Sequence, residues 1–581
     1  MNNKLKSILI SACALSATLS INAHSNSVFI DDITIFDSTG AAPFISDVLI
    51  ENGRFVAIEP QLKAPDNAVM INGNGLSLVA GLTDVHTHWT SSRAEVATAM
   101  LTHGVTTVTD FHSSPDSYAP KREWHTKLIS PHVIYAARIA PPGGHGADWA
   151  DERMTRLVAS TEEAKSVVAY LDDFKPDMIK VFADGWRYGR SKEDTNISPD
   201  ALAEIVTQSA LRGLPVVTHT VTVDGGMLAA KAGVSAIVHA IQDEPTHAVL
   251  PKLMADNNVY YAPTLAVYEI RPDRVARYSD KQIKAAQLRQ TYSQQNFRSF
   301  LNAGVHLALG TDSGIGNTPF GESSVHEMEL MVDFGATAKQ ALIAGTRGGA
   351  EALGLADDRG TIATGKRADF VIVDGKPWEN ISDYRKLKSV FIDGKQVVAD
   401  NKLTSEQGAE IPPAIIATEN IDDFEAMEGK TQYGTLRKTN IDYGFPRSQI
   451  LTLVKPATSS SNKVLSVSIA LENKKNPKAG VLFPLSQGSF YPVDASNFKG
   501  VSFAINAKPS TYTVTLDSYA GKSSVDVNIS ASGWQTITIP FNHFVKQGKL
   551  DIGLLKSISI DVTGKPEETF WIELDDVKFT P

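Results

Sequence analysis

The chain has 581 residues, a formal net charge of −10 and 8% aromatic residues. This length exceeds that of a typical single domain, so we expect at least two folding units. An acidic chain without a cluster of lysines and arginines does not favour nucleic acid as a partner.

The first 23 residues are typical of a secretory signal peptide. Lys4 and Lys6 precede a short apolar run that ends at Ala23, so we expect cleavage there and a secreted or periplasmic protein. The apolar run is too short to cross a bilayer comfortably, so no transmembrane span is expected. Lipid attachment at Cys13, in a sequence that resembles a lipoprotein cleavage site, is the alternative. Because Cys13 is the only cysteine, cleavage at Ala23 would leave no thiol for a disulfide or a metal.

Two β-rich segments, 24–80 and 361–400, flank the central part of the chain. In the first, Asn52-Gly53 separates two alternating runs, a pattern typical of a tight hairpin. The second contains strand patterns on either side of Asp393-Gly394. We expect the two segments to form one small β-sandwich that the central domain interrupts.

The central segment, 81–360, alternates strand and helix patterns. Eight strand patterns are found, at 83–88, 105–111, 132–140, 177–184, 215–220, 235–240, 259–265 and 305–312. Eight such units in about 280 residues predict an α/β fold, a TIM (β/α)8 barrel. An open doubly wound sheet is the alternative, which the lack of a glycine-rich dinucleotide loop after a first strand disfavours.

The last part of the chain has a different composition. Residues 401–417 are largely polar, contain Pro412-Pro413 and are predicted to be a linker. Residues 418–581 are rich in Ser, Thr, Val, Ile and aromatics in alternating runs. This pattern predicts an all-β domain, an antiparallel sandwich or jelly roll.

His86 and His88 end the first strand of the central segment. Side chains two residues apart on a strand share a face, so both imidazoles point the same way. In a TIM barrel, the carboxyl ends of the strands carry the active site. Neighbouring imidazoles on one face can bind a single metal ion. Two histidines hydrogen-bonded inside a core are the alternative.

Other strands end in similar groups. His219, His239 and Asp312 each close a strand, and Lys180 lies within an apolar one. Each has a structural explanation when taken alone: a core histidine, a carboxylate that caps a helix, or a lysine that extends to solvent. Together with the first two histidines, they place six ligand-capable groups around one barrel mouth and predict a metal site.

Lys180 needs an explanation of its own, because burying an ammonium group costs several kcal/mol unless it is paired. Burial lowers the pKa of a lysine and exposes a reactive neutral amine. Reaction with CO₂ would give a carbamate, an anionic ligand with two oxygens that can bridge two metals. A Schiff-base lysine and an ion pair with Asp312 are alternatives, but the histidines favour the carbamate.

The motifs "DVHTHW", "IKVFADG", "VVTHT", "AIVHA" and "ALGTDSG" together resemble the metal-dependent amidohydrolase superfamily. Residues 321–380 are similar to its imidazolonepropionase-like and prolidase-like branch, and the resemblance spans about 28–400. It implies a TIM barrel with a split β-sandwich. It also implies a binuclear centre whose ligands are His86, His88, carbamylated Lys180, His219, His239 and Asp312.

In the implied mechanism, Lys180 bridges two divalent metals that share a water, whose pKa falls toward about 7. The resulting hydroxide attacks a carbonyl, and Asp312 accepts the proton and returns it to the leaving nitrogen. Zinc suits a histidine-rich site, with manganese, cobalt or iron as alternatives. The expected activity is hydrolysis of an amide, a cyclic amide or a small peptide. A lactonase, a phosphotriesterase and a non-catalytic binding protein on this scaffold are the alternatives.

The substrate-binding residues are less well defined. His145 lies in "PPGGHG", which resembles a glycine-rich loop near the substrate in this branch, and Tyr188 and Tyr261 are candidates for contacts to a small-molecule substrate. Two features depart from the family pattern. Thr220 follows His219 where a small alanine is common, and the loop "ADGWRYGRSKEDTN" lacks a Gly-Gly pair. We therefore expect a pocket that differs from that of the dipeptidases.

The C-terminal domain carries a second resemblance. The segments 421–425, 498–507, 533–544 and 570–579 look like parts of a CIA30-type, galactose-binding-like jelly roll that spans 418–581. The resemblance implies a carbohydrate or protein ligand. A passive domain that packs on the barrel, or on another subunit of a homo-oligomer, is the alternative.

Overall fold

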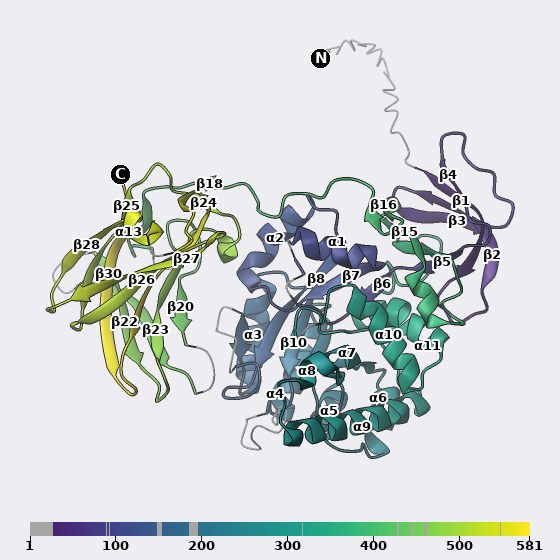
Figure 1. Ribbon diagram of the computed structural model, residues 1–581. Coiled ribbons are helices and arrows are strands. Elements are labelled where there is room, and N and C mark those ends of the chain that lie inside the picture. Colours follow the sequence, from purple (N-terminus) through teal and green to yellow (C-terminus); the bar gives the residue numbers. More distant parts are fainter. Residues whose placement is uncertain are drawn as a thin grey trace, which may run out of the picture.

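The computed structural model describes residues 27–88, 90–91, 93–147, 154–184, 196–316, 318–426, 429–442, 446–457, 462–546 and 548–581. A central unit of strands and helices lies between two β-rich units (Figure 1). The predicted signal peptide lies outside the described ranges. Within them, every helix is too short or too polar to cross a bilayer.

Both flanking segments contribute strands to one nine-stranded sheet. The first segment supplies β1 (Val28–Phe36), β2 (Phe44–Glu51), β3 (Arg54–Glu59), β4 (Val69–Asn72) and β5 (Ser77–Ala80). The second supplies β14 (Phe370–Val373), β15 (Leu387–Ile392), β16 (Lys395–Ala399) and β17 (Lys402–Leu403). Strand β5 pairs with β14, which joins the two segments.

Two tight hairpins of this sheet use the residues that the sequence indicates. Asn52-Gly53 connects β2 to β3, and Asp393-Gly394 connects β15 to β16. All four residues have positive φ, between 49° and 78°. Asparagine, aspartate and glycine tolerate this conformation best, and two-residue hairpin turns of the favoured type require it at both positions.

The central sheet is parallel and curled. Its strands are β6 (Leu82–Asp84), β7 (Val105–Asp110), β8 (His132–Ala140), β10 (Met178–Phe182), β11 (Val216–His219), β12 (Ala236–Val238) and β13 (Tyr260–Ala262), with a short β9 (Thr155–Leu157) beside β8. They follow one another across the sheet in chain order. Seven of the eight predicted strand segments therefore contain a strand, although several strands are shorter than predicted.

The eighth predicted segment, 305–312, lies between the two outermost strands. Leu307 bridges Tyr261 of β13, and Ser313 bridges Thr87 just beyond β6. The amide of Asp312 donates to the carbonyl of His86 over 2.7 Å. The strands thus form a curled half-barrel, and both of its edges hydrogen-bond to this segment.

Side chains alternate between the two faces of the curled sheet. In β10, Met178 packs with the apolar interior, whereas Ile179 and Val181 pack against the helices outside. Alternation of this kind places Lys180 on the interior face, two residues after Met178. The chemistry-bearing side chains of these strands therefore project into the space that the sheet encloses.

Helices cover the outer face of the sheet (Figure 1). They are α1 (Ala94–Thr102), α2 (Tyr118–His125), α3 (Thr161–Asp172), α4 (Pro199–Ala210), α5 (Val223–Ala232), α6 (Val249–Asp256), α9 (Asp280–Asn302), α10 (Glu322–Phe334), α11 (Ala338–Ile343) and α12 (Gly349–Ala352), with α7 (Leu265–Tyr268) and α8 (Pro272–Val275) after β13. The predicted capping box is present at the start of α11, where Thr337 and Gln340 bond reciprocally.

In its described residues, the C-terminal unit is all-β, as predicted, apart from the short α13 (Phe541–Val545) and two 3₁₀ turns. One sheet holds β18 (Ile415–Ile416), β20 (Lys438–Ile441), β23 (Lys478–Pro484), β24 (Val493–Asp494), β26 (Ser510–Ser518), β27 (Gly521–Ile529) and β29 (Leu555–Thr563). The other holds β19 (Asn420–Asp422), β21 (Gln449–Pro456), β22 (Lys463–Ala470), β25 (Gly500–Ala507), β28 (Gln535–Pro540) and β30 (Thr569–Thr580). Apolar side chains of both sheets form one buried cluster.

The predicted linker is attached to the central unit by side-chain hydrogen bonds. Gln407 accepts from the amide of Ile129 and donates to its carbonyl, both over 2.8 Å. Glu410 accepts from the amide of Ala94, the first residue of α1, over 2.6 Å. A carboxylate at this position satisfies an amide that a helix start leaves without a partner inside the helix.

The C-terminal unit packs against two segments that follow central strands. The 3₁₀ turn Pro115–Ser117, after β7, lies against the turn Gln487–Ser489, so closely that a Cβ at Gly488 would be 2.2 Å from the Cβ of Ser117. Arg447 donates to the carbonyl of Ala147, after β8, over 3.3 Å. The C-terminal unit therefore contacts the loops at the carboxyl ends of β7 and β8.

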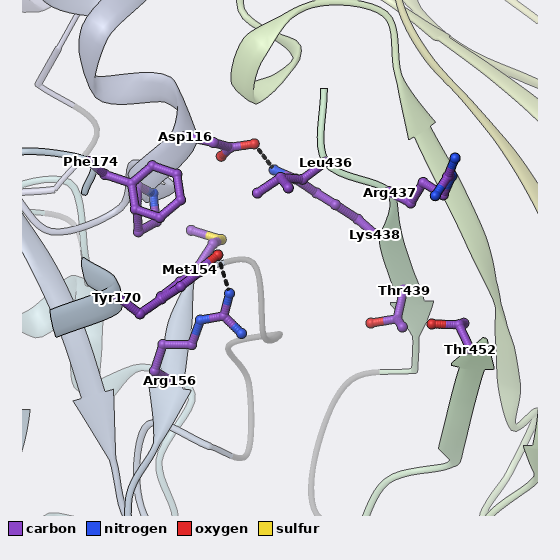
Figure 2. A pocket seen from close by; sticks show the side chains of 11 residues that line it. Asp116, Met154, Arg156, Tyr170, Phe174, Leu436, Arg437, Lys438, Thr439 and Thr452 are labelled. Carbon is purple, nitrogen blue, oxygen red and sulfur yellow. Dashed lines mark hydrogen bonds and ion pairs between the residues drawn. The ribbon is translucent and has the colours of Figure 1, made fainter. Parts of the chain in front are cut away.

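A pocket of about 170 Å³ lies between the two units (Figure 2). Arg156 and Tyr170 line it from the central unit, and Thr439 and Thr452 line it from the C-terminal unit. An ion pair between Asp116 and Lys438 crosses the gap, with both side chains about nine-tenths buried.

Candidate functional site

A buried cavity of about 160 Å³ lies at the carboxyl ends of the central strands. Its walls contain the six predicted metal-site residues and one predicted substrate contact, together with four residues that we did not predict. The lining residues are His86, His88, Phe111, Arg138, His145, Lys180, Phe182, His219, His239, Asp312 and Ile315. The structure thus brings together groups that are more than 200 residues apart in the chain.

The first cluster of donors contains His86, His88 and Asp312. The Nε2 atoms of the two histidines lie 3.1 and 2.9 Å from the same oxygen, Oδ1 of Asp312. Burial disfavours the charged form of Asp312, but hydrogen bonds from the two histidines outweigh it and hold the pKa of this carboxyl well below its usual value. Two imidazoles and an ionised carboxylate are a donor set that suits a divalent transition metal.

Strained backbone orients several of these groups. His239 has φ of 83°, Asp312 has φ of 61°, and Thr264, which contacts His239, has φ of 49°. His239 immediately follows β12, Thr264 lies two residues after the end of β13, and Asp312 is the last residue of the eighth segment. A side chain other than glycine in this region costs about 1–3 kcal/mol, and such strain is concentrated at functional sites.

Lys180 lies on the interior face of β10 and is 2% exposed. Its Nζ is 3.3 Å from Nδ1 of His86 and 4.7 Å from the centroid of the Phe111 ring. Burial lowers the pKa of this amine well below its usual value, and the charges of Asp312 and Asp184 only partly oppose the shift. The neutral amine that carbamate formation requires is therefore accessible.

The second cluster contains His145, Asp184 and His219. Nδ1 of His145 lies 2.9 Å from Oδ1 of Asp184, and Nε2 of His219 lies 3.3 Å from Oδ2 of the same carboxylate. One donor atom from each of the three residues lies within 4.8 Å of the others. These residues come from the loop after β8, the end of β10 and the end of β11.

His239 lies between the two clusters. The centroid of its ring is 4.6 Å from that of His86 and 4.0 Å from that of His219. Its Nδ1 is 2.9 Å from Oγ1 of Thr264, a contact that fixes the orientation of the ring. The cavity therefore holds a continuous row of imidazoles flanked by carboxylates.

Three of the buried histidines, His86, His219 and His239, are neutral at physiological pH. Burial lowers the pKa of His86 to about 3, and it lowers the pKa values of His219 and His239 well below the usual value. Metal ions bind the neutral form of imidazole, so no proton has to be displaced from these rings at neutral pH.

Two charged residues at the site were not predicted: Arg138, which lines the cavity, and Asp184, which contacts the lining residues His145 and His219. Arg138 is 1% exposed, and its Nε donates to the carbonyl of Met154 over 3.3 Å. Both could have been found from the alternation that identified the histidines. Arg138 follows the interior Ile134 and Ala136 on β8, and Asp184 follows Lys180 and Phe182 by even steps.

The two tyrosines that we considered for substrate binding lie elsewhere. Tyr188 lies outside the described residues. Tyr261 does not line the cavity: its ring packs against Phe297 and Phe300, and its hydroxyl accepts from the amide of Ile241. The prediction is wrong for Tyr261, because it occupies the outward-facing position of β13 while its neighbour Ala262 faces the interior.

Comparison with known proteins identifies the family of the chain. The model of the Amidohydrolase family matches residues 77–397, more than half of the chain. The imidazolonepropionase of Geobacillus kaustophilus is 25% identical over 400 residues, which cover 61% of this chain and 91% of that protein. The imidazolonepropionase of Flavobacterium johnsoniae is 34% identical over 103 residues, but this match covers only 18% of the chain and 23% of that relative.

The fold is also similar to solved structures. A crystal structure of a Xaa-Pro dipeptidase with bound methionine in its active site matches with a TM-score of 0.56 and 22% identity, covering 64% of this chain and all but 1% of that one. The identity is low, so this likeness concerns the fold. The family match shows that the chain belongs to the amidohydrolase family, and together with its imidazolonepropionase relatives it supports a hydrolase that acts on carbon–nitrogen bonds.

Proposed function

We propose that the protein is a metal-dependent hydrolase that cleaves a carbon–nitrogen bond in an amide, a cyclic amide or a small peptide. The observation that carries the proposal is the convergence of two imidazole–carboxylate clusters and a buried lysine on one cavity, in a chain of the amidohydrolase family. His86, His88 and Asp312 would hold one ion, and His219 and His239 a second. Lys180, as a carbamate formed with CO₂, would bridge them.

The donor set fits divalent metals. His86, His219 and His239 are neutral and Asp312 is ionised at neutral pH, which is the state that binding requires. Nitrogen and oxygen donors favour zinc, with manganese, cobalt or iron as alternatives. When bound, such ions acidify a water molecule and polarise the carbonyl of the substrate.

The chain supplies the proton transfer and the enclosure. Asp312 is ionised and lines the cavity, so it can accept a proton from the attacking water and return it to the leaving nitrogen. Phe111, Phe182 and Ile315 form apolar walls that limit the access of other water. His145 lines the same cavity and remains a proposed substrate contact.

The cavity favours a small reacting group. Its volume of about 160 Å³ is below the range of roughly 300–1,000 Å³ that is usual for ligand pockets, so the scissile group and a short side chain fill it. The similarity to imidazolonepropionases and to a Xaa-Pro dipeptidase supports a cyclic amide or a short peptide.

The proposal also includes three features of the whole protein. Residues 305–312 would close the half-barrel into a TIM barrel, which the hydrogen bonds of this segment to both edges support. The C-terminal unit would be a CIA30-type jelly roll with a carbohydrate or protein ligand. The mature protein would be secreted or periplasmic after cleavage at Ala23.

A hydrolysis screen tests the activity. Mature protein loaded with zinc or manganese is assayed with dipeptides, N-acyl amino acids and cyclic amides, and in parallel with lactones and a phosphotriester. His86→Ala, which removes a donor, should abolish turnover, whereas His247→Ala, on the exposed surface, should not. Turnover confined to lactones and phosphotriesters, or turnover that survives His86→Ala, would contradict the proposal.

A further inference from the structure

The carboxylate of Asp184 lies between two histidine rings inside the cavity region. One of its oxygens faces His145 and the other faces His219, over 2.9 and 3.3 Å. The side chain of Asp184 is fully buried. Three polar side chains from separate parts of the chain therefore converge, with one donor atom of each within 4.8 Å of the others.

The charge of this cluster suits a cation. Burying an ionised carboxylate is unfavourable unless an opposite charge compensates it. Both facing imidazoles are buried, and imidazole nitrogens and carboxylate oxygens are donors that a divalent transition metal takes. A divalent ion held by these three side chains would compensate such a charge.

The proposed binuclear centre lacks an anionic donor at its second ion. Imidazole is not an anionic donor, so among the proposed ligands of that ion only the carbamate on Lys180 carries a negative charge. Asp184 lies four residues after Lys180 and two residues beyond the end of β10, and its charge acts on the lysine amine. The chain thus holds a permanent carboxylate beside the position that CO₂ would have to modify.

We propose that Asp184 is a direct ligand of the second metal ion, together with His145 and His219. The inference rests on the proposed metal-dependent function and adds Asp184 and His145 to the donors of the second ion, so that His145 binds the metal instead of the substrate. The second site then has an anionic oxygen whether or not Lys180 is carbamylated. The other role open to Asp184 is that of a hydrogen-bond acceptor that only orients His219.

Metal binding by the full chain tests this inference directly. Protein stripped with a chelator is titrated with Co²⁺, and stoichiometry is measured by elemental analysis, affinity by calorimetry and the ligand field by visible absorption. The variants are Asp184→Asn, which keeps size and hydrogen bonding, and Asp184→His, which restores a donor. Asp110→Asn is the matched control, because Asp110 is equally buried at the end of β7 and its oxygens accept from Ser91, His112 and Ser113.

The wild type and Asp110→Asn should bind two ions per chain. Asp184→Asn should retain one ion and bind the second more than about 100-fold more weakly, beyond the usual effect of losing an outer-shell partner. Its absorption spectrum should lose the contribution of the second site, and Asp184→His should restore the second ion. The second ion of the wild type should also persist in CO₂-free buffer.

Two results would overturn the inference. One is binding of two ions by Asp184→Asn with an unchanged spectrum and a loss of affinity of about 10-fold or less, which identifies an orienting partner. The other is an equal loss in Asp184→Asn and Asp110→Asn, which identifies a general effect of buried carboxylates. If the wild type binds no metal, the proposed function fails instead, so the two failures are distinguishable.

Discussion

Nζ of Lys180 lies 3.3 Å from Nδ1 of His86, deep in the cavity and beside the ring of Phe111. An ammonium group in this position would be largely desolvated and would sit against a donor that a metal needs. Conversion to a carbamate would remove the cation and supply oxygen donors in its place. Lys180 therefore adds a positive charge to the cavity as an ammonium group and a negative charge as a carbamate.

Lys180→Ala should lose metal affinity and turnover, and acetate or formate should restore part of both. A small carboxylic acid can occupy the vacated space and supply two oxygens as a carbamate would. Metal content and kcat/KM are measured against acid concentration, with methylammonium at the same ionic strength as control. Rescue by methylammonium and not by acetate would show that the lysine acts as a cation.

Asp312→Asn should retain the bound metal but lose turnover by a factor of about 10²–10⁴, the usual contribution of a positioned acid or base. The amide keeps an oxygen that can face the two histidines but cannot accept a proton from water. Metal content and kcat are measured on the same preparation, so that loss of metal is not mistaken for loss of the base. Hydrolysis at the parental rate would refute the assignment.

Thr264 positions His239 through the 2.9 Å contact between its hydroxyl and Nδ1 of the ring. Thr264→Val keeps the branched shape but removes the hydroxyl, and should reduce metal affinity or activity by about 10–100-fold. Thr264→Ser keeps the hydroxyl and should differ little from the wild type. If the two variants lose affinity equally, the effect comes from the backbone, whose φ at this residue is 49°.

Much of the site follows from strand periodicity. His86 and His88, two residues apart at a strand end, predict a shared face, and the groups that close other strands predict one common mouth. The same rule, applied further along β8 and β10, would have added Arg138 and Asp184. Periodicity shows which residues of a strand share a face, but not which face points into the cavity. Tyr261 was misplaced because we did not assign the inner and outer faces of β13.

Other features depend on long-range packing and leave no local signal in the sequence. The positive φ of Thr264 occurs in a β-branched residue, which does not favour this conformation, so the surrounding fold must impose it. The contact between Ser117 and Gly488 joins segments about 370 residues apart. Neither segment alone indicates that the C-terminal unit packs beside the loops of the cavity.

Lys438→Met should loosen the contact between the central and C-terminal units. Removing one partner of a largely buried ion pair leaves the other uncompensated, at a cost of about 3–5 kcal/mol. Amide hydrogen exchange of residues 115–117 should accelerate, and Asp116→Asn in the same background should recover part of the lost stability.

Lys252→Met is the control: it removes an exposed ion pair with Asp256 and should cost less than about 1 kcal/mol. Equal exchange in both single variants would contradict this prediction.

Asp358 should make stability depend on pH. It forms ion pairs with Arg54, Arg359 and Arg367 at 3.0, 3.0 and 2.7 Å, which join the central unit to the nine-stranded sheet. Burial favours the neutral form, but hydrogen bonds from Arg367 and Arg359 outweigh it and place the pKa of this carboxyl below its usual value. The folded state therefore releases the proton more readily than the unfolded state does.

The sign of the effect follows from this depressed pKa. Asp358 should contribute its full stabilisation above about pH 5 and lose it as the pH falls toward the pKa of the folded state. Asp358→Asn should therefore unfold at lower denaturant concentration than the wild type near neutral pH, and the difference should shrink in acid. Because the carboxylate is partly exposed, each ion pair should contribute no more than about 1 kcal/mol. Urea unfolding of both proteins from neutral pH to about pH 3 measures this, and a difference that stays constant would show that the ion pairs of Asp358 do not contribute to stability.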